Sequence, residues 1–174
     1  MDVAALLTDA YGRVHAEVHG VLDGLDPALL GARVEPAANS IAWLVWHLTR
    51  VQDDHVADAF GTGQVWTADG WAERFGLPFA PAATGYGQSR ADVDALGAVP
   101  ADLLLGYHDA VHARTLGLLA QVQPEDLDRV VDTRWDPPVT LGVRLVSVLS
   151  DDLQHVGQAA YARGVLRRSA TPAG

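Results

Sequence analysis

The chain has 174 residues, 49% of them hydrophobic, which is enough to bury the core of one ordinary domain. Its formal net charge of −10 offers no basic face to nucleic acid or to an anionic membrane surface, so we expect neither as a partner. Because the sequence contains no cysteine, disulfides, thiolate metal sites and cysteine nucleophiles are excluded, and any metal must bind to His, Asp or Glu.

The first predicted element is an amphipathic helix over roughly residues 2–25, where apolar residues recur at the three- and four-residue steps of one helix face. Asp26-Pro27 ends the pattern, because the residue before a proline avoids helical angles. The early acidic residues and the short, interrupted apolar stretch fit neither a signal peptide nor a membrane-spanning helix. We therefore expect a cytoplasmic protein.

A second helix is predicted to begin after Asn39-Ser40, either of which could cap it, and to end at Gly61. The apolar residues of its inward stripe are Ile41, Leu44, Leu48 and Val51. His47 falls on the same side of the helix as this stripe. The second helix is therefore expected to point a histidine into the core.

A long connection rich in Gly, Pro and aromatic residues follows, with a length of about forty residues. Connections of this length inside a compact domain usually have structure or a function of their own. We expect a short helix near Ala68 to Phe75, and we expect the connection to cover one mouth of the bundle.

The third predicted helix begins at Pro100 and ends before Pro124, and the fourth follows Pro137-Pro138 with Thr140 as its cap. Together the four segments predict an all-α fold, a four-helix bundle with a long crossover connection between its second and third helices. No internal repeat or composition shift divides the chain, so we expect one domain over residues 1–174.

The fourth helix carries the segment most indicative of chemistry. Asp151 and His155 are four residues apart and share a helix face, so one ion could bind both. Asp152 is three residues from His155 and is an alternative ligand. Burying these groups and His47 without partners would cost about 2–7 kcal/mol each. A divalent metal bound to His47, Asp151 and His155 would satisfy all three, and hydrogen bonds across the bundle are the alternative.

Two other histidine pairs have the same four-residue spacing. They are His15 with His19 in the first helix and His108 with His112 in the third. The second member of each pair falls toward the polar edge of its helix, so we expect boundary or surface histidines. His15 or His108 could instead contact the metal ligands and orient them without binding the metal.

Other polar residues near the inward stripes have open roles. His55, two turns beyond His47, could contact a substrate in the same cavity or lie at the surface. Arg50 and Arg144 lie near the stripe edges, where a solvated salt bridge is the expected role. None of them is assigned as a catalytic residue, and no general acid or base is identified.

The residues SIAWLVWHLTRVQDDH, followed about a hundred residues later by SDDLQHVGQAAYARG, resemble the DinB-like superfamily of metal-binding four-helix bundles. In that superfamily one histidine on the second helix and two residues four apart on the last helix bind the metal. The matching positions here are His47, Asp151 and His155. Many DinB-like proteins have histidine where this chain has Asp151, and the mycothiol-dependent maleylpyruvate isomerases look closer because they have an acidic residue there.

The resemblance also implies a metal at one end of the core, frequently in a dimer, and thiol chemistry where an activity is established. We therefore expect a divalent ion, Zn with Ni or Fe as alternatives, and transfer or isomerisation of a small-molecule substrate with a low-molecular-weight thiol such as mycothiol or bacillithiol. A homodimer is the expected assembly. Two rival hypotheses are a hydrolase that uses metal-bound hydroxide and a non-enzymatic stress or interaction bundle with a structural metal.

Overall fold

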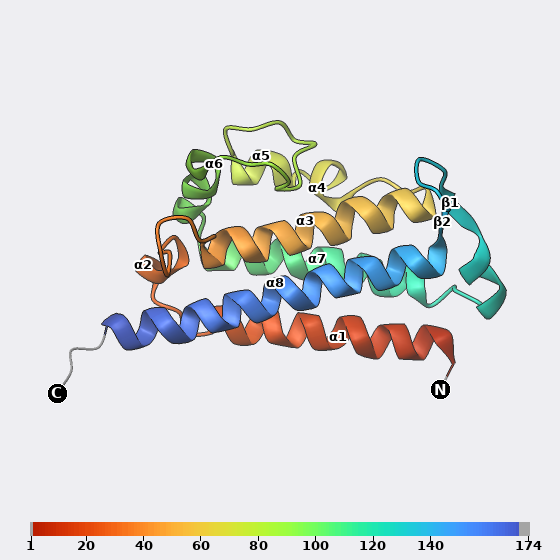
Figure 1. The fold of residues 1–174 in the computed structure, drawn as a ribbon, viewed down its shortest axis with the longest axis horizontal. Helices are drawn as coiled ribbons and strands as arrows, with labels where there is room; N and C mark the ends of the chain where they lie inside the picture. Colours follow the sequence, from red (N-terminus) through yellow and green to blue (C-terminus); the bar gives the residue numbers. More distant parts are fainter. Residues whose placement is uncertain (1, 171–174) are drawn as a thin grey trace.

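The computed structural model describes residues 2–170, and four long helices dominate this part of the chain (Figure 1). The long helices are α1 (Val3–Leu22), α3 (Ile41–Phe60), α7 (Ala101–Leu119) and α8 (Leu141–Ala170). The shorter elements are α2 (Pro27–Leu30), α4 (Val65–Ala68), α5 (Trp71–Phe75), α6 (Arg90–Ala95), the 3₁₀ turns η1 (Leu96–Ala98) and η2 (Pro124–Asp128), and the strands β1 (Val130–Asp132) and β2 (Val139–Thr140). The predicted all-α fold is confirmed.

The long helices form a bundle in which α1 and α8 run in one direction and α3 and α7 in the other (Figure 1). Helices α3 and α7 are consecutive among the long helices and run in the same direction. The segment between them must therefore return along the length of the bundle. This segment is the long crossover that the sequence predicted.

Two of the predicted helix starts are confirmed by their caps. The Ser40 hydroxyl accepts a hydrogen bond from the Trp43 amide (3.2 Å) at the start of α3, and Thr140 Oγ1 accepts one from the Val143 amide (3.4 Å) at the start of α8. At the other end of α3, Gly61 has the left-handed conformation (φ +64°) that commonly ends a helix.

The prediction that the first helix reaches Asp26-Pro27 was wrong. Helix α1 ends at Leu22, and Gly24 follows with a left-handed φ of +55°. The proline does not simply stop a helix. It begins one, because its fixed φ suits the first turn of α2, where the Asp26 carboxylate accepts a hydrogen bond from the Ala28 amide (2.9 Å).

The crossover between α3 and α7 is only partly as predicted. The helix expected near Ala68 to Phe75 is two short helices, α4 and α5, separated by Gly70 with φ +74°, and α6 and η1 were not predicted. The crossover does not cover a mouth of the bundle but lies along its side, over α3 (Figure 1). The reason is apolar packing, since the rings of Trp66 and Phe75 lie 5.0 and 5.8 Å from the ring of Tyr107 on α7.

The position of the crossover places α3 at the centre of the molecule. Its predicted inward stripe is buried, which confirms the stripe. The opposite face of α3 is also buried, including Trp43 and Trp46, because the crossover covers it. A helix that is buried on nearly all sides can hold polar residues in the interior, and α3 carries His47 and Arg50 there.

A short antiparallel hairpin of β1 and β2 precedes α8 and was not predicted. The buried Asp132 of β1 accepts hydrogen bonds from Arg144 Nη2 (2.8 Å) and Arg134 Nη2 (2.9 Å). This bond from Arg144 ties the hairpin to the first turn of α8. Within residues 2–170, none of the helices combines the length and hydropathy that crossing a lipid bilayer requires.

Candidate metal centre

The α3–α8 interface brings together His47, Asp151 and His155, which we call the central triad. His47 lies in the middle of α3, and the other two are one turn apart on α8. One ligand atom from each side chain lies within 4.8 Å of the others. His155 Nε2 is 3.6 Å from Asp151 Oδ1, and the rings of His47 and His155 meet edge to face at 4.6 Å. The structure thus holds a candidate His/Asp metal-binding group.

Hydrogen bonds fix how both imidazole rings of the central triad present their nitrogens. Nδ1 of His47 donates to the carbonyl oxygen of Thr84, and Nδ1 of His155 donates to Gln158 Oε1 (2.9 Å). A carbonyl oxygen only accepts, so in each neutral ring the proton is on Nδ1 and the lone pair is on Nε2. Metal-binding histidines almost always have such an outer partner, which orients the ring.

The carboxylate of the central triad also fits a cation. Asp151 Oδ2 is buried and has no hydrogen-bond partner among the described residues, an arrangement that is costly unless something binds the oxygen. Asp152, the alternative ligand, is outside the triad. Burial raises the pKa of Asp152 well above its usual value, and the charge of Asp151 adds to this, so the neutral acid is favoured.

The pKa values of the two imidazoles of the central triad are shifted in opposite directions. Burial lowers the pKa of His47, and the neighbouring His155 lowers it further against the opposing effect of the Thr84 bond. The nearby Asp151 carboxylate raises the pKa of His155 despite the partial burial of that ring. The neutral form of His47 is thus favoured, and that is the form a metal ligand needs.

Residues 83–88 of the crossover, which we call the 83–88 segment, lie against α3 beside the triad. Three side chains of α3, spaced by about one turn, donate hydrogen bonds to this segment. The bonds run from Trp43 Nε1 to Gln88 Oε1 (2.7 Å), from His47 Nδ1 to the Thr84 carbonyl and from Arg50 Nε to the Ala83 carbonyl (3.2 Å). The segment therefore runs antiparallel to α3, and its backbone orients a metal ligand.

Gly85 allows this close approach. Its φ is +113°, and an added Cβ would clash with His47 Nδ1 and lie 3.0 Å from Trp43 Cζ2. We expect Gly85→Ala to lower the free energy of unfolding by about 1–3 kcal/mol and to weaken metal binding by roughly tenfold, because the displaced segment releases His47. Urea unfolding and metal titration measure the two effects.

Gly87→Ala is the matched control for this prediction. Gly87 is in the same segment with a similar left-handed φ of +71°, but an added Cβ there would meet nothing within 4 Å. Backbone strain alone acts in this variant, so metal binding should be unchanged. Equal loss of metal affinity in both variants would mean that contact with His47 is not what Gly85 provides.

The prediction that Arg50 forms a solvated salt bridge was wrong. Its side chain is fully buried, because the crossover covers that face of α3. Arg50 Nη1 lies 3.5 Å from Asp53 Oδ2 and 3.2 Å from the Tyr107 hydroxyl, which donates to the same Asp53 oxygen (2.9 Å). Asp53 also accepts hydrogen bonds from the amides of Val65 (2.9 Å) and Trp66 (2.7 Å) at the start of α4. The network fixes the crossover to α3.

Arg144 likewise is buried, contrary to the prediction, since its guanidinium binds Asp132 of the hairpin. Arg144 Nη1 is also 3.5 Å from His55 Nδ1. Burial lowers the pKa of His55, and the charge of Arg144 lowers it further. His55 is partly exposed and lines a pocket, so its position fits either of the two roles left open for it.

The pocket has a volume of about 640 Å³. Its lining residues come from α3, the 83–88 segment, the hairpin and α8, and are His55, Tyr86, Asp132, Arg134, Trp135, Arg144 and Ser147. The ring of Tyr86 meets the ring of His47 edge to face at 5.2 Å, so the pocket adjoins the central triad. Tyr86 and Trp135 were not foreseen, because no periodic pattern marks residues in loops and turns.

The remaining histidines form a separate group between α1 and α7. His108 is completely buried, so the expectation of a boundary or surface residue was wrong for it. Its Nδ1 lies 3.0 Å from the Thr49 hydroxyl, and burial lowers its pKa to about 3. His15 and His19 are partly exposed and lie near Asp109. These rings contact one another and Thr49, not the central triad as the supporting role required.

The comparisons with known proteins agree with the fold. The family model of the DinB superfamily matches residues 10–159, a range that includes all three triad residues. The crystal structure of a conserved protein from Enterococcus faecalis is similar at 29% identity and a TM-score of 0.89, covering 97% of this chain and 99% of that chain. No curated protein matches. The chain belongs to the DinB superfamily.

Proposed function

We propose that the protein is a metal-dependent enzyme that transfers or isomerises a small molecule with a low-molecular-weight thiol of the mycothiol type. The observation that carries this proposal is the central triad, whose two Nε2 lone pairs and unpartnered carboxylate oxygen adjoin a pocket of about 640 Å³. Two imidazoles and one carboxylate suit Zn²⁺ and leave room in its coordination shell. A bound divalent ion would supply Lewis acidity, which lowers the pKa of a coordinated thiol.

The protein's own groups would bind and orient the reactants. Thr84 and Gln158 hold the two imidazole rings with Nε2 free. In the pocket, two guanidinium groups, those of Arg134 and Arg144, share the single carboxylate of Asp132. The side chain of Arg134 is 74% exposed, so its guanidinium would bind the carboxylate of an acceptor or of a thiol. The aromatic ring of Trp135 is 65% exposed and offers an apolar wall beside it.

Turnover with a panel of thiols and electrophiles tests the proposal. Protein prepared without an affinity tag and loaded with zinc should consume mycothiol, bacillithiol or cysteine in the presence of a carboxylate-bearing alkyl halide or unsaturated acid. His155→Gln should lower kcat/KM by roughly a hundredfold or more, since it removes a ligand rather than an outer partner. Gln154→Leu is the matched control, because Gln154 is on the same helix and, among the described residues, bonds only to Ser150.

Two outcomes would contradict the proposal. Turnover of esters or amides without any thiol would point to a hydrolase that uses water in place of the thiol. No turnover with any acceptor, combined with a large fall in Tm on chelation, would point to a bundle that the metal only stabilises.

A further inference from the structure

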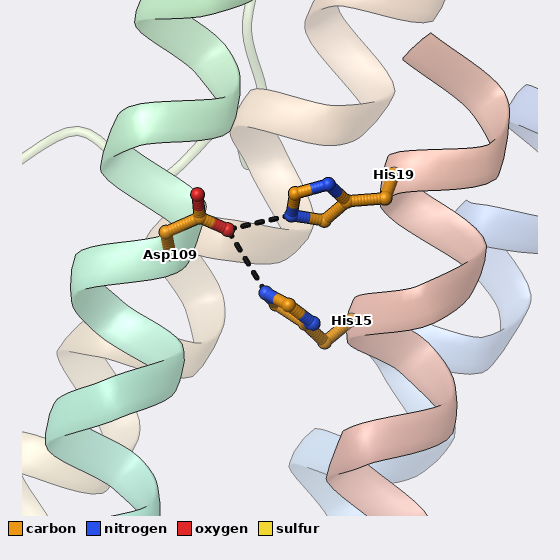
Figure 2. Close-up of side chains that lie close together, drawn as sticks. All are labelled: His15, His19 and Asp109. Carbon is orange, nitrogen blue, oxygen red and sulfur yellow. Dashed lines mark hydrogen bonds and ion pairs between the residues drawn. The ribbon is translucent and has the colours of Figure 1, made fainter. Parts of the chain in front are cut away.

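A second group of ligating side chains lies at the α1–α7 interface. It consists of His15, His19 and Asp109, which we call the α1–α7 cluster, and Figure 2 shows both rings directed at the same carboxylate. His15 Nε2 is 2.9 Å and His19 Nε2 is 2.7 Å from Asp109 Oδ1. One ligand atom from each residue lies within 4.8 Å of the others. The cluster shares no residue and no helix with the central triad.

The cluster is accessible to ions from solvent. The side chains of His15, His19 and Asp109 are 30%, 43% and 48% exposed. An ion could therefore enter without any movement of the bundle, and water could fill the coordination positions that the protein leaves open. Asp109 Oδ1 has two lone pairs and accepts a hydrogen bond from the Nε2 of each imidazole, so an ion bound here would take the place of two Nε2 protons.

The spacing of the ligand atoms is close to that of a tetrahedral ion. Bonds of about 2.0–2.1 Å place tetrahedral ligands about 3.3 Å apart. The Nε2–Oδ1 distances of 2.9 and 2.7 Å must therefore open by roughly half an ångström, which small rotations of three partly exposed side chains can provide. Histidines four apart on a helix present both rings to one point, as His15 and His19 do.

Further rings support the cluster from α7. The ring of His112 stacks on the ring of His15 at 4.2 Å, and that of His108 lies 5.6 Å from it. This packing limits the orientations that His15 can adopt, which lowers the entropy lost when it binds an ion.

We propose that the α1–α7 cluster is a second divalent-metal site, which binds Zn²⁺ or another ion that prefers imidazole and which links α1 to α7. This site does not depend on the function proposed for the central triad.

Zinc titration of metal-free, untagged full-length protein tests the second site. Calorimetry and elemental analysis should give about two zinc ions per chain for the wild type. His155→Gln, which disables the central triad, should retain about one, and so should the His15→Gln/His19→Gln variant. Combining all three substitutions should abolish binding. Asp102→Asn, at an exposed position on the same helix as Asp109, should bind like the wild type.

A second measurement tests whether the bound ion stabilises the packing of α1 against α7. In the His155→Gln background, zinc at about a hundred times its Kd should raise Tm by roughly 5–10 °C, and Asp109→Asn should remove this rise. Unchanged stoichiometry in the His15→Gln/His19→Gln variant, with an unchanged circular dichroism spectrum, would overturn the second site. Zinc binding that leaves Tm unchanged would contradict the proposal that the ion links α1 to α7. Neither result would alter the turnover expected from the central triad.

Discussion

A His155→Ala variant is expected to bind zinc at the central triad at least about a hundredfold more weakly than the wild type, because it loses one of three protein ligands. The substitution should be made in the His15→Gln/His19→Gln background, so that the α1–α7 cluster does not contribute. Competition with a chromophoric chelator then gives the affinity. Wild-type affinity in the variant would show that His155 is not a ligand.

The outer partner of the same ring provides a graded comparison. Gln158→Leu removes the acceptor that fixes the His155 ring but leaves the ligand in place, so the loss should be roughly 10- to 100-fold. Gln154→Leu, one turn earlier on α8, removes a glutamine whose bonds within residues 2–170 go to Ser150 alone, and this variant should bind zinc like the wild type. Equal affinities for the two leucine variants would mean that the Gln158 bond does not orient the ring.

The Arg50→Met variant is expected to lose about 3–5 kcal/mol of its free energy of unfolding. The substitution keeps most of the apolar volume but leaves Asp53 buried without a charged partner. It also leaves the Ala83 carbonyl and Gln64 Oε1 without the hydrogen bonds that Arg50 donates to them at 3.2 and 3.0 Å. Urea unfolding followed by circular dichroism measures the change.

Arg13→Met is the matched control for this prediction. Arg13 pairs with Asp9 on the surface of α1, where its side chain is 75% exposed. Exposed pairs of this spacing contribute only about 0.3–0.5 kcal/mol, so the variant should unfold almost like the wild type. If Arg50→Met were no more destabilising than Arg13→Met, the buried network would not be what fixes the crossover to α3.

Local sequence periodicity sufficed to predict the four long helices and the faces that carry the central triad. The four-residue step between Asp151 and His155 and the placement of His47 on an apolar stripe depend only on helix geometry. The family resemblance then selected Asp151 over Asp152. The Thr84 carbonyl beside His47 could not be predicted, because any residue supplies a backbone acceptor and only the path of the loop decides where it lies.

Burial of polar residues was predicted least well. Arginine is rarely fully buried without a partner, so the sequence favours a surface position for Arg50. Apart from Asp53 on α3 itself, the partners of Arg50 come from the crossover and α7. His108 was misplaced for a similar reason, since its bond to Thr49 joins two helices that are distant in sequence. The pairing of Asp109 with His15 depends on the rotation of α1 against α7, which no local pattern encodes.

The three bonds from α3 to the 83–88 segment restrict where the chain can change in length. An inserted residue adds up to about 3.5 Å of backbone, whereas the donors on α3 have fixed positions. An insertion between Thr84 and Gln88 would shift one acceptor out of register and would turn the His47 ring or free Trp43. Residues 80–82 are exposed and precede all three bonds, so an insertion there leaves the register intact. Related chains can therefore differ in length ahead of the segment while keeping its own length constant.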